Sequence, residues 1–284
     1  MSAALQSAAR EPATRDRSAP PATRQGLAVA DVREAGSLWR LCGTLAWLDI
    51  KQRYRGSVLG PFWLTLSTAV MAGAMGGIYA SLFHMNLHEY LPFLVLSLVL
   101  WGYLAGLVGD ACMAFTASES MIRSVRMPFT LYAVRIVLRN VMILAHNVVV
   151  VVAVLAIFQT WPGPEALAAL PGLAVWMIDS CALTILLGAL CARYRDIPPI
   201  VANVVQMAFF VTPVIWKPEV VSAGRQWMLT LNPFYGLLQL VRAPVLGVLP
   251  SPGETASALL YSALLWAVAW FVFVRVRGRI AFWV

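Results

Sequence analysis

The chain contains only two lysines, and neither stands where a phosphate-binding loop would need one. Lys51 follows Ile50 and Lys217 follows Trp216, whereas the P-loop pattern G-x-x-x-x-G-K-[ST] places its lysine directly after a glycine, so that it reaches the β- and γ-phosphates. We therefore predict that the chain does not hydrolyse ATP by that route. If ATP drives the protein, a second polypeptide must supply the ATPase.

The side chains that could pair a base with a carboxylate are His84, His88 and Glu89. Acid–base catalysis also needs a partner that orients the base in a site that excludes water, and no second polar cluster supports one. No D-x-D or G-x-S-x-G pattern occurs, so glycosyl transfer and serine hydrolysis lack their usual marks. A membrane-embedded transferase of lipid-linked sugars remains an alternative from another class, but we predict no catalytic residue.

The four cysteines show no spacing typical of a metal site or a disulfide framework. They lie in or beside apolar segments, which indicates small buried hydrophobic side chains: Cys42, Cys112, Cys181 and Cys191. We predict no metal site and no cofactor on this chain.

The composition indicates a protein that crosses a membrane several times. Of the 284 residues, 60% are hydrophobic and 12% are charged, against about half and about a quarter in soluble domains. The fifth of six apolar stretches is short and contains Pro213, so it can kink or stop early. We predict an all-α polytopic membrane protein with six transmembrane helices at about 61–83, 91–115, 136–158, 167–192, 198–216 and 256–274.

The basic residues stand at the ends of these apolar stretches, which favours membrane topology over nucleic acid as the reason for the net charge of +8. Of the 21 lysines and arginines, 18 lie in alternate connecting segments, and the other three are Lys217, Arg225 and Arg242. The positive-inside rule then places both termini in the cytoplasm.

Three segments flank or interrupt the spans. Residues 1–36 lack apolar periodicity and are predicted to be a disordered cytoplasmic tail. Residues 37–55 carry Leu38, Leu41, Cys42, Leu45 and Leu48 at helical spacing, which predicts an amphipathic interface helix or, alternatively, a plain cap on the first span. Residues 56–284 form the six-helix transmembrane domain.

The proline-rich stretch at about 217–250 contains two short helix-like pieces, 219–230 and 234–247. Neither is long enough to span a membrane. We predict a re-entrant hairpin on the outer side between the fifth and sixth spans, with an ordinary extracellular loop as the alternative.

Ionisable residues inside the spans are candidates for transport coupling. Asp110, Asp179 and His146 are scattered, so hydrogen-bonded packing, or a pair such as Asp110 with Arg139, is the simpler interpretation. Arg135 and Arg139 lie one turn apart and can extend to the membrane interface.

Aromatic residues at span ends usually mark the membrane interface, but rings that face a lumen can stack on sugars. Both interpretations apply to Phe62, Trp63, Phe209, Phe210 and Trp216.

Four stretches in this order resemble the ABC-2-type transporter permeases that export polysaccharides. They are residues 53–63 (RYRGSVLGPFW), 120–129 (SMIRSVRMPF), 193–197 (RYRDI) leading into 209–214 (FFVTPV), and 231–235 (LNPFY) followed by Arg242. Each motif is weak alone, but their order and spacing make the set specific over about residues 37–280. The stretches LTLST at 64–68 and HEYLP at 88–92 look most like the O-antigen export (Wzm-like) subgroup.

The resemblance implies the transmembrane subunit of an exporter that moves a polyprenyl-pyrophosphate-linked polysaccharide of the O-antigen type across the bacterial inner membrane. It implies a homodimer bound to two copies of a separate ABC ATPase, which uses ATP and Mg²⁺. Exporters of teichoic acid, capsule, lipid or drug share the fold and the partners, and they remain alternatives.

The resemblance also implies residue roles. Spans one and five line the channel, so that the five aromatic residues above would follow the sugar path. Arg53 and Arg55 would lie where the pyrophosphate headgroup enters, although topology alone also explains arginines there. The implied ATPase contacts are Arg123, Arg126, Met127, Pro128 and Phe129, and the implied outer gate is Asn232, Pro233, Phe234 and Tyr235.

Overall fold

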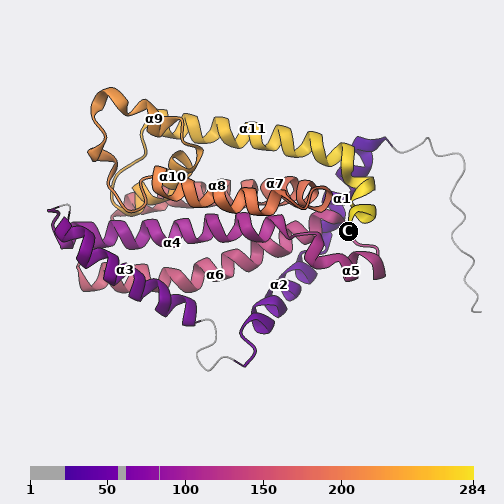
Figure 1. Cartoon of the computed structure of the whole chain (residues 1–284), viewed down its shortest axis with the longest axis horizontal. Helices are drawn as coiled ribbons and strands as arrows, with labels where there is room; N and C mark the ends of the chain where they lie inside the picture. Colours follow the sequence, from indigo (N-terminus) through magenta and orange to yellow (C-terminus); the bar gives the residue numbers. More distant parts are fainter. Residues whose placement is uncertain (1–22, 57–61, 83) are drawn as a thin grey trace, which may run out of the picture.

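The computed structural model describes residues 23–56, 62–82 and 84–284, and the regular secondary structure in this part of the chain is entirely helical. Figure 1 shows the N-terminal helix and the C-terminus at one end of the molecule, here called the terminal end, and α9 and α10 at the opposite, hairpin end. The α-helices are α1 (Arg24–Ser37), α2 (Trp39–Arg53), α3 (Phe62–Leu82), α4 (Leu87–Cys112), α5 (Glu119–Ser124), α6 (Phe129–Ile157), α7 (Ala169–Arg193), α8 (Ile197–Val211), α9 (Trp227–Thr230), α10 (Pro233–Val245), α11 (Pro252–Val276) and α12 (Ile280–Trp283). Short 3₁₀ helices are η1 (Thr116–Ser118), η2 (Pro164–Ala168), η3 (Pro218–Val220), η4 (Ala223–Arg225) and η5 (Arg277–Arg279).

Five helical stretches are long and apolar enough to cross a membrane. Each has at least 18 residues, and about 20 residues at 1.5 Å per residue cover a hydrocarbon core of about 30 Å. They coincide with five of the six predicted spans, so the prediction of an all-helical membrane protein is confirmed at that level. The stretches are Thr65–Leu82, Leu87–Cys112, Phe129–Ile157, Pro164–Arg193 and Pro252–Trp283.

The predicted fifth span, 198–216, is only partly helical. Its helix α8 has 15 residues, or about 22 Å, which is shorter than the hydrocarbon core. The helix stops because Thr212 precedes Pro213, and a residue before proline is disfavoured in the helical conformation; Thr212 is extended instead. A sixth crossing therefore stays a prediction.

Helix α4 forms the centre of the bundle. Two thirds (67%) of its span is buried, and it packs against α3, α6, α7, α8 and α10. A helix that is apolar on every face needs such surroundings. By contrast, only 22% of the spans that contain α3, α6 and α11 is buried.

The N-terminal region is more ordered than its composition predicts. Residues 1–22 lie outside the described residues, but the prediction of a disordered tail is wrong for residues 24–36, which belong to α1. The side chain of Thr23 accepts a hydrogen bond from the Gly26 N–H at 3.1 Å and begins the helix. No apolar periodicity in the sequence indicates this helix, because a buried carboxylate, and not an apolar stripe, attaches it to the bundle.

That carboxylate is Asp31, which is fully buried (0% exposed) and joins three elements. It accepts hydrogen bonds from the Phe129 and Thr130 N–H groups at 3.1 and 2.9 Å, and it therefore caps the first turn of α6. It also pairs with Nε of Arg277 in η5 at 2.7 Å. One side chain thus fastens α1 to the terminal ends of α6 and α11.

The predicted amphipathic helix before the first span corresponds to α2. Cys42, Ala46 and Ile50 form its buried stripe, and the helix packs on α6, whereas Trp39 and Trp47 are exposed. The helix is confirmed, but of the predicted apolar face only Cys42 belongs to the buried stripe, and Leu48 is exposed. Its position in the membrane interface stays a prediction.

The first of the two helices predicted at the hairpin end does not form. Residues 219–230 are broken into η3, η4 and the single turn α9, because Pro218, Gly224 and a nearly complete lack of buried side chains leave nothing to stabilise a longer helix. The second prediction, 234–247, corresponds to α10. Gly247, with φ of 81°, ends that helix in the left-handed conformation that glycine allows.

We expect Asp31→Asn to destabilise the protein. The amide would present an N–H₂ group toward Arg277 or the α6 N–H groups, so that donors would face donors in a buried site. The expected cost is roughly 2–3 kcal/mol, and the midpoint of thermal unfolding in detergent should fall by roughly 5–10 °C. Glu34→Gln, on the exposed face of the same helix, is the control, and equal midpoints for the two variants would contradict the role given to Asp31.

Candidate functional site

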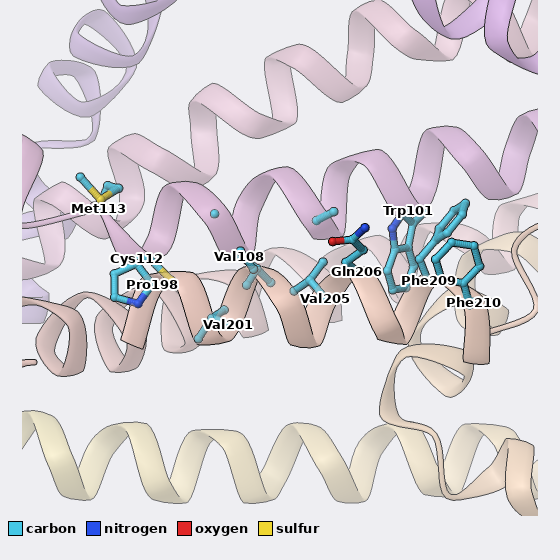
Figure 2. A pocket seen from close by; sticks show the side chains of 13 residues that line it. Trp101, Val108, Cys112, Met113, Pro198, Val201, Val205, Gln206, Phe209 and Phe210 are labelled. Carbon is cyan, nitrogen blue, oxygen red and sulfur yellow. The ribbon is translucent and has the colours of Figure 1, made fainter. Parts of the chain in front are cut away.

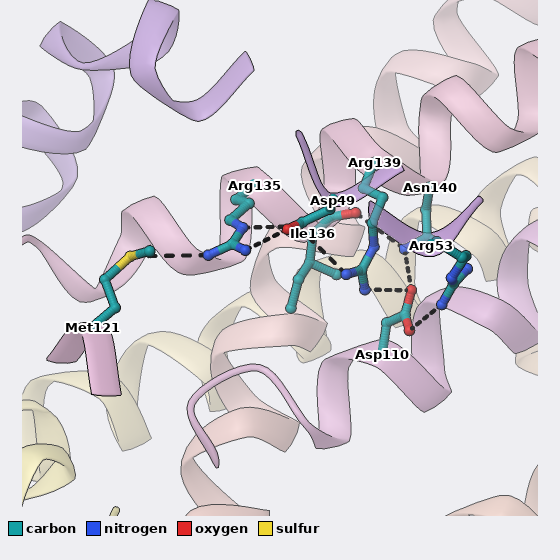
Figure 3. Close-up of polar contacts among 8 residues, drawn as sticks. All are labelled: Asp49, Arg53, Asp110, Met121, Arg135, Ile136, Arg139 and Asn140. Atoms are coloured by element: carbon teal, nitrogen blue, oxygen red, sulfur yellow. Dashed lines mark hydrogen bonds and ion pairs between the residues drawn. The ribbon is translucent and has the colours of Figure 1, made fainter. Parts of the chain in front are cut away.

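At the terminal end, a cluster of ion pairs joins α2, α4 and α6 (Figure 3). Arg135 of α6 binds Asp49 of α2 through two nitrogens: Nε lies 2.8 Å from Oδ2, and Nη2 pairs with Oδ1. A two-point contact between guanidinium and carboxylate fixes orientation as well as distance. The side chains are 19% and 11% exposed, so this pair anchors α2 on α6 inside the bundle.

Asp110 of α4 is the second carboxylate of the cluster. Its Oδ2 lies 2.7 Å from Nη2 of Arg139 and accepts a hydrogen bond from Nδ2 of Asn140 at 2.8 Å. Its Oδ1 lies 3.7 Å from Nη2 of Arg53. Arg139 also lies 3.5 Å from Asp49. The cluster therefore contains three guanidinium groups and two carboxylates.

The predicted pair of Asp110 with Arg139 is confirmed. Arg135 and Arg139 are bound to carboxylates between the helices, and their expected extension to the membrane interface stays a prediction. Sequence reasoning missed Asp49. Its one signal was an acidic residue in an otherwise basic segment before the first span.

The two arginines predicted at the headgroup site have different surroundings. The Arg53 side chain joins the cluster and is 46% exposed, whereas Arg55 is exposed in the turn that follows α2. Residues 57–61 of the same motif lie outside the described residues.

An apolar groove of about 580 Å³ lies between α4 and α8 (Figure 2). Toward the hairpin end it is lined by Trp101 and Phe209, whose ring centroids are 5.7 Å apart, and by Phe210, 5.3 Å from Phe209. Toward the terminal end its lining is aliphatic and reaches Met113. The groove thus offers aromatic faces, with Gln206 as the one amide side chain in its lining.

The five predicted channel aromatics fall into two groups. Phe209 and Phe210 line the groove, and Nε1 of Trp216 donates to the backbone oxygen of Phe210 at 3.1 Å. Phe62 and Trp63 begin α3, which packs on α4 and α6, and they are 63% and 56% exposed. Trp101 was missed because a tryptophan inside a long apolar stretch carries no distinguishing pattern.

At the hairpin end, Asn232 caps α10 and ties it to the end of α8. Its Oδ1 accepts hydrogen bonds from the N–H groups of Phe234 and Tyr235, at 3.0 and 3.3 Å. Its Nδ2 donates to Oγ1 of Thr212 at 2.9 Å. The ring of Phe234 lies 5.4 Å from that of Trp101, so the predicted gate motif is continuous with the aromatic part of the groove.

Arg242 of α10 is almost completely buried, with 1% exposed. Nη1 donates to Oγ of Ser97 at 3.0 Å and to the backbone oxygen of Pro213, and Nε and Nη2 donate to Oε1 of Gln239 at 3.0 and 2.8 Å. The guanidinium also lies 4.7 Å from the centre of the Phe93 ring. Because a buried charge is tolerated only when its donors are satisfied, this network fixes α10 to α4 and to the segment after α8.

The segment predicted to contact an ATPase contains the short helix α5. Arg123 pairs with Glu119 at 2.8 Å and donates to the backbone oxygen of Val284 at 2.6 Å, so it links α5 to the end of α12. Ser124, Val125 and Arg126 are exposed, whereas Met127 and Phe129 are half-buried and Pro128 is buried.

The other ionisable residues that the sequence indicated do not gather into one cluster. Asp179 accepts a hydrogen bond from Ser262 of α11 at 2.6 Å, and Nδ1 of His146 lies 2.7 Å from the backbone oxygen of Met142. Glu89 pairs loosely with Lys217 at 3.7 Å, and His88 packs edge-on against Phe158. Within residues 23–56, 62–82 and 84–284, no three metal-ligating side chains come together, and no proton relay forms from these groups.

The sequence pattern of the ABC-2 type transporter family matches residues 40–246, which is more than half of the chain. The chain belongs to this family. Membership implies a membrane-embedded transport subunit and a partner ATPase. The matched region begins in α2 and ends just after α10, and it includes the ion-pair cluster, the groove and Arg242.

The chain is also similar to curated proteins. The O-antigen export system permease protein RfbA of Myxococcus xanthus is 24% identical over 209 residues, which cover 73% of this chain and 80% of that protein. Two proteins of the same name from Klebsiella pneumoniae are 22% and 21% identical over 204 residues, which cover 72% of this chain and 79% of each relative.

We expect Arg242→Met to loosen the hairpin. Methionine fills a similar volume but leaves Ser97, Gln239 and the Pro213 carbonyl without their donor. The expected cost is roughly 2–3 kcal/mol, which limited proteolysis and thermal unfolding in detergent would detect as earlier cleavage near residues 217–250 and a lower midpoint. Arg225→Met, at an exposed position of the same segment, is the matched control, and identical behaviour of the two variants would contradict the anchoring role.

Proposed function

We propose that this protein is the permease subunit of an ABC exporter that moves a polyprenyl-pyrophosphate-linked polysaccharide of the O-antigen type out of the cytoplasm. The observation that carries the proposal is the family match together with three relatives named O-antigen export system permease protein, each aligned over more than 70% of this chain. Exporters of teichoic acid, capsule, lipid or drug share the family and remain the competing substrates.

In this proposal two copies of the chain form the permease, and two copies of a separate ATPase bind ATP and Mg²⁺. The described part of the chain supports a second copy by its outward apolar faces. Phe62 and Trp63 of α3 and Phe210 of α8 are more than half exposed, and residues 198–216 would complete the sixth crossing beside the partner. The two helices would then line one continuous passage, with the α4–α8 groove along its wall.

The proposed location is the bacterial inner membrane, with both termini in the cytoplasm. The asymmetry of the basic residues supports this orientation, because 18 of 21 fall in segments assigned to one side. In Figure 1, α1, α5 and the C-terminus share the terminal end, which would face the ATPase. The hairpin at 217–250 would then lie at the outer mouth, with Asn232, Pro233, Phe234 and Tyr235 in the gate.

The proposed contact with the ATPase is the exposed strip Ser124–Arg126 at the end of α5. Arg123 would act indirectly by holding α5 on the Val284 backbone. The pyrophosphate headgroup would arrive at the other exposed basic site of the terminal end, Arg53 and Arg55, because guanidinium groups match phosphate oxygens and stay charged.

The proposed function predicts the phenotype of a deletion strain. Loss of the permease should remove the polysaccharide from the cell surface and cause its lipid-linked form to accumulate in the cytoplasm, because synthesis continues without export. Surface staining and extraction of the lipid-linked polymer would measure both. A normal surface polysaccharide in the deletion strain would exclude this substrate and favour the lipid or drug alternatives.

The aromatic path can be tested in the same strain. Complementation with Phe210→Ala should lower surface polysaccharide several-fold, since the sugar chain would lose a stacking face worth about 1 kcal/mol or more at each passing unit, while the amount of permease in the membrane is unchanged. Phe271→Ala, an exposed aromatic of α11, is the control. Equal export in both variants would remove the aromatic groove from the path.

The contact with the ATPase predicts that Arg126→Glu uncouples hydrolysis from export. Charge reversal on an exposed docking strip should weaken co-purification of the ATPase at least several-fold and reduce export in parallel. Arg225→Glu makes the same charge change at the hairpin end and should leave co-purification unaffected. Docking would have to be placed elsewhere if Arg126→Glu retained the ATPase and exported normally.

A further inference from the structure

The three guanidinium groups of the α2–α4–α6 cluster are bound to very different degrees. Arg135 makes a two-point hydrogen bond with Asp49. Arg139 reaches both carboxylates through its Nη atoms only, and its Nε is buried with no hydrogen-bond partner among the described residues. The contact of Arg53 with Asp110 is 3.7 Å, which is beyond hydrogen-bond distance. Two of the three arginines therefore have donors to spare.

Arg53 is the most exposed arginine of the cluster. The side chains of Arg135, Arg139 and Arg53 are 19%, 18% and 46% exposed, and those of Asp49 and Asp110 are 11% and 20% exposed. Arg53 therefore lies toward the surface, whereas Arg139 is as enclosed as the well-bound Arg135. Asp110 stands between Arg53 and Arg139, with one carboxylate oxygen directed at each. An anion arriving from the surface would meet Arg53 first and Arg139 second.

We propose that Arg53 and Arg139 form an anion site that Asp110 occupies at rest, and that the pyrophosphate headgroup of the lipid-linked substrate displaces Asp110 from both arginines. The inference rests on the proposed function and adds Arg139 as a headgroup ligand and Asp110 as its internal competitor. A pyrophosphate ester carries more negative charge and more acceptor oxygens than one carboxylate, so it can satisfy two guanidinium groups that a single aspartate leaves under-bonded.

The displaced carboxylate would not be left without a partner. Asn140 donates to Oδ2 of Asp110 from Nδ2, which also bonds the backbone oxygen of Ile136 at 3.0 Å and so keeps its position. The pair of Asp49 with Arg135 is not part of the exchange, so α2 stays attached to α6. Binding would break the two ion pairs of Asp110, which join α4 to Arg53 of α2 and to Arg139 of α6, and the central helix would thereby sense the substrate.

The direction in which Asp110→Asn changes the affinity for the headgroup distinguishes this exchange from a cluster that only holds the helices together. If Asp110 competes with the headgroup, Asp110→Asn removes a negative charge from the site and should tighten binding roughly tenfold. If Asp110 only holds the helices together, the same variant should weaken binding or leave it unchanged. Asp49→Asn is the matched control, and it should lower thermal stability without tightening binding.

The experiment uses the complete permease–ATPase complex in nanodiscs of zwitterionic lipid. Binding of a labelled polyprenyl pyrophosphate and stimulation of ATP hydrolysis are measured for the wild type, Asp110→Asn, Asp49→Asn, Arg139→Gln and Arg53→Gln. The two arginine variants should bind roughly tenfold more weakly. Polyprenyl monophosphate, phosphatidylglycerol and inorganic pyrophosphate are tested alongside, and each should bind the wild type at least tenfold more weakly than the polyprenyl pyrophosphate.

The outcomes separate this inference from the function on which it rests. If the wild-type complex neither binds nor responds to polyprenyl pyrophosphate, both fail. If it responds but Arg139→Gln or Arg53→Gln binds as tightly as the wild type, or Asp110→Asn binds no more tightly, the exchange site alone is overturned. Equal binding of phosphatidylglycerol or inorganic pyrophosphate would overturn the lipid pyrophosphate as the ligand. Should Asp110→Asn not fold, Arg53→Gln, at the half-exposed end of the cluster, decides the question.

Discussion

Charged and polar groups that lie among apolar helices must find partners within the protein, because lipid offers none, and this constraint sets the arrangement of the whole chain. Asp31 has no exposed surface, and it closes the first turn of α6 while neutralising Arg277. Asp49 and Asp110 hold three arginines from two helices. Each pairing joins segments far apart in the sequence, so the polar contacts determine which apolar faces meet.

Between these polar contacts, close packing sets the spacing of the helices. A side chain at Gly172 of α7 would place its Cβ 2.5 Å from the backbone oxygen of Leu240, so α10 can rest directly on α7 only because that residue is glycine. One turn further along α7, Nε1 of Trp176 donates to the backbone oxygen of Leu237 at 2.9 Å. Helix α10 is therefore held at backbone distance from α7, and its position depends on α7 as much as on Arg242.

The long helices could be predicted from the sequence because their apolar stretches are long enough to cross a membrane as a helix, whereas strands and buried helices of soluble proteins are usually shorter. The short elements could not. The order of α1 depends on one aspartate whose partners lie about 100 and 246 residues away, and no local pattern encodes such a contact. The end of α8 was foreseen from Pro213, yet the composition of 219–230 suggested a helix that tertiary contacts do not stabilise. At the candidate site, the resemblance to the ABC-2 family pointed to Arg53, Phe209 and Phe210, whose roles stay predictions, whereas the contacts of Asp49 and Trp101 needed the fold.

The two arginine networks of the molecule differ in how many of their guanidinium donors are hydrogen-bonded. This difference indicates which network a bound ligand could rearrange. Arg242 has all three guanidinium nitrogens hydrogen-bonded and is buried beneath the hairpin. Removing any of these acceptors would leave a buried N–H donor of Arg242 unsatisfied, so we expect α10, α4 and residues 212–216 to move as one unit in any opening at this end. At the opposite end, Arg53 is half-exposed and contacts Asp110 only at 3.7 Å, and Arg139 has a buried Nε with no hydrogen-bond partner among the described residues. In the proposed exchange, a ligand would improve the bonding of Arg53 and Arg139 but could not improve that of Arg242. Both networks contact α4, through Asp110 and Ser97, so a shift of this central helix would connect the proposed anion site with the proposed gate.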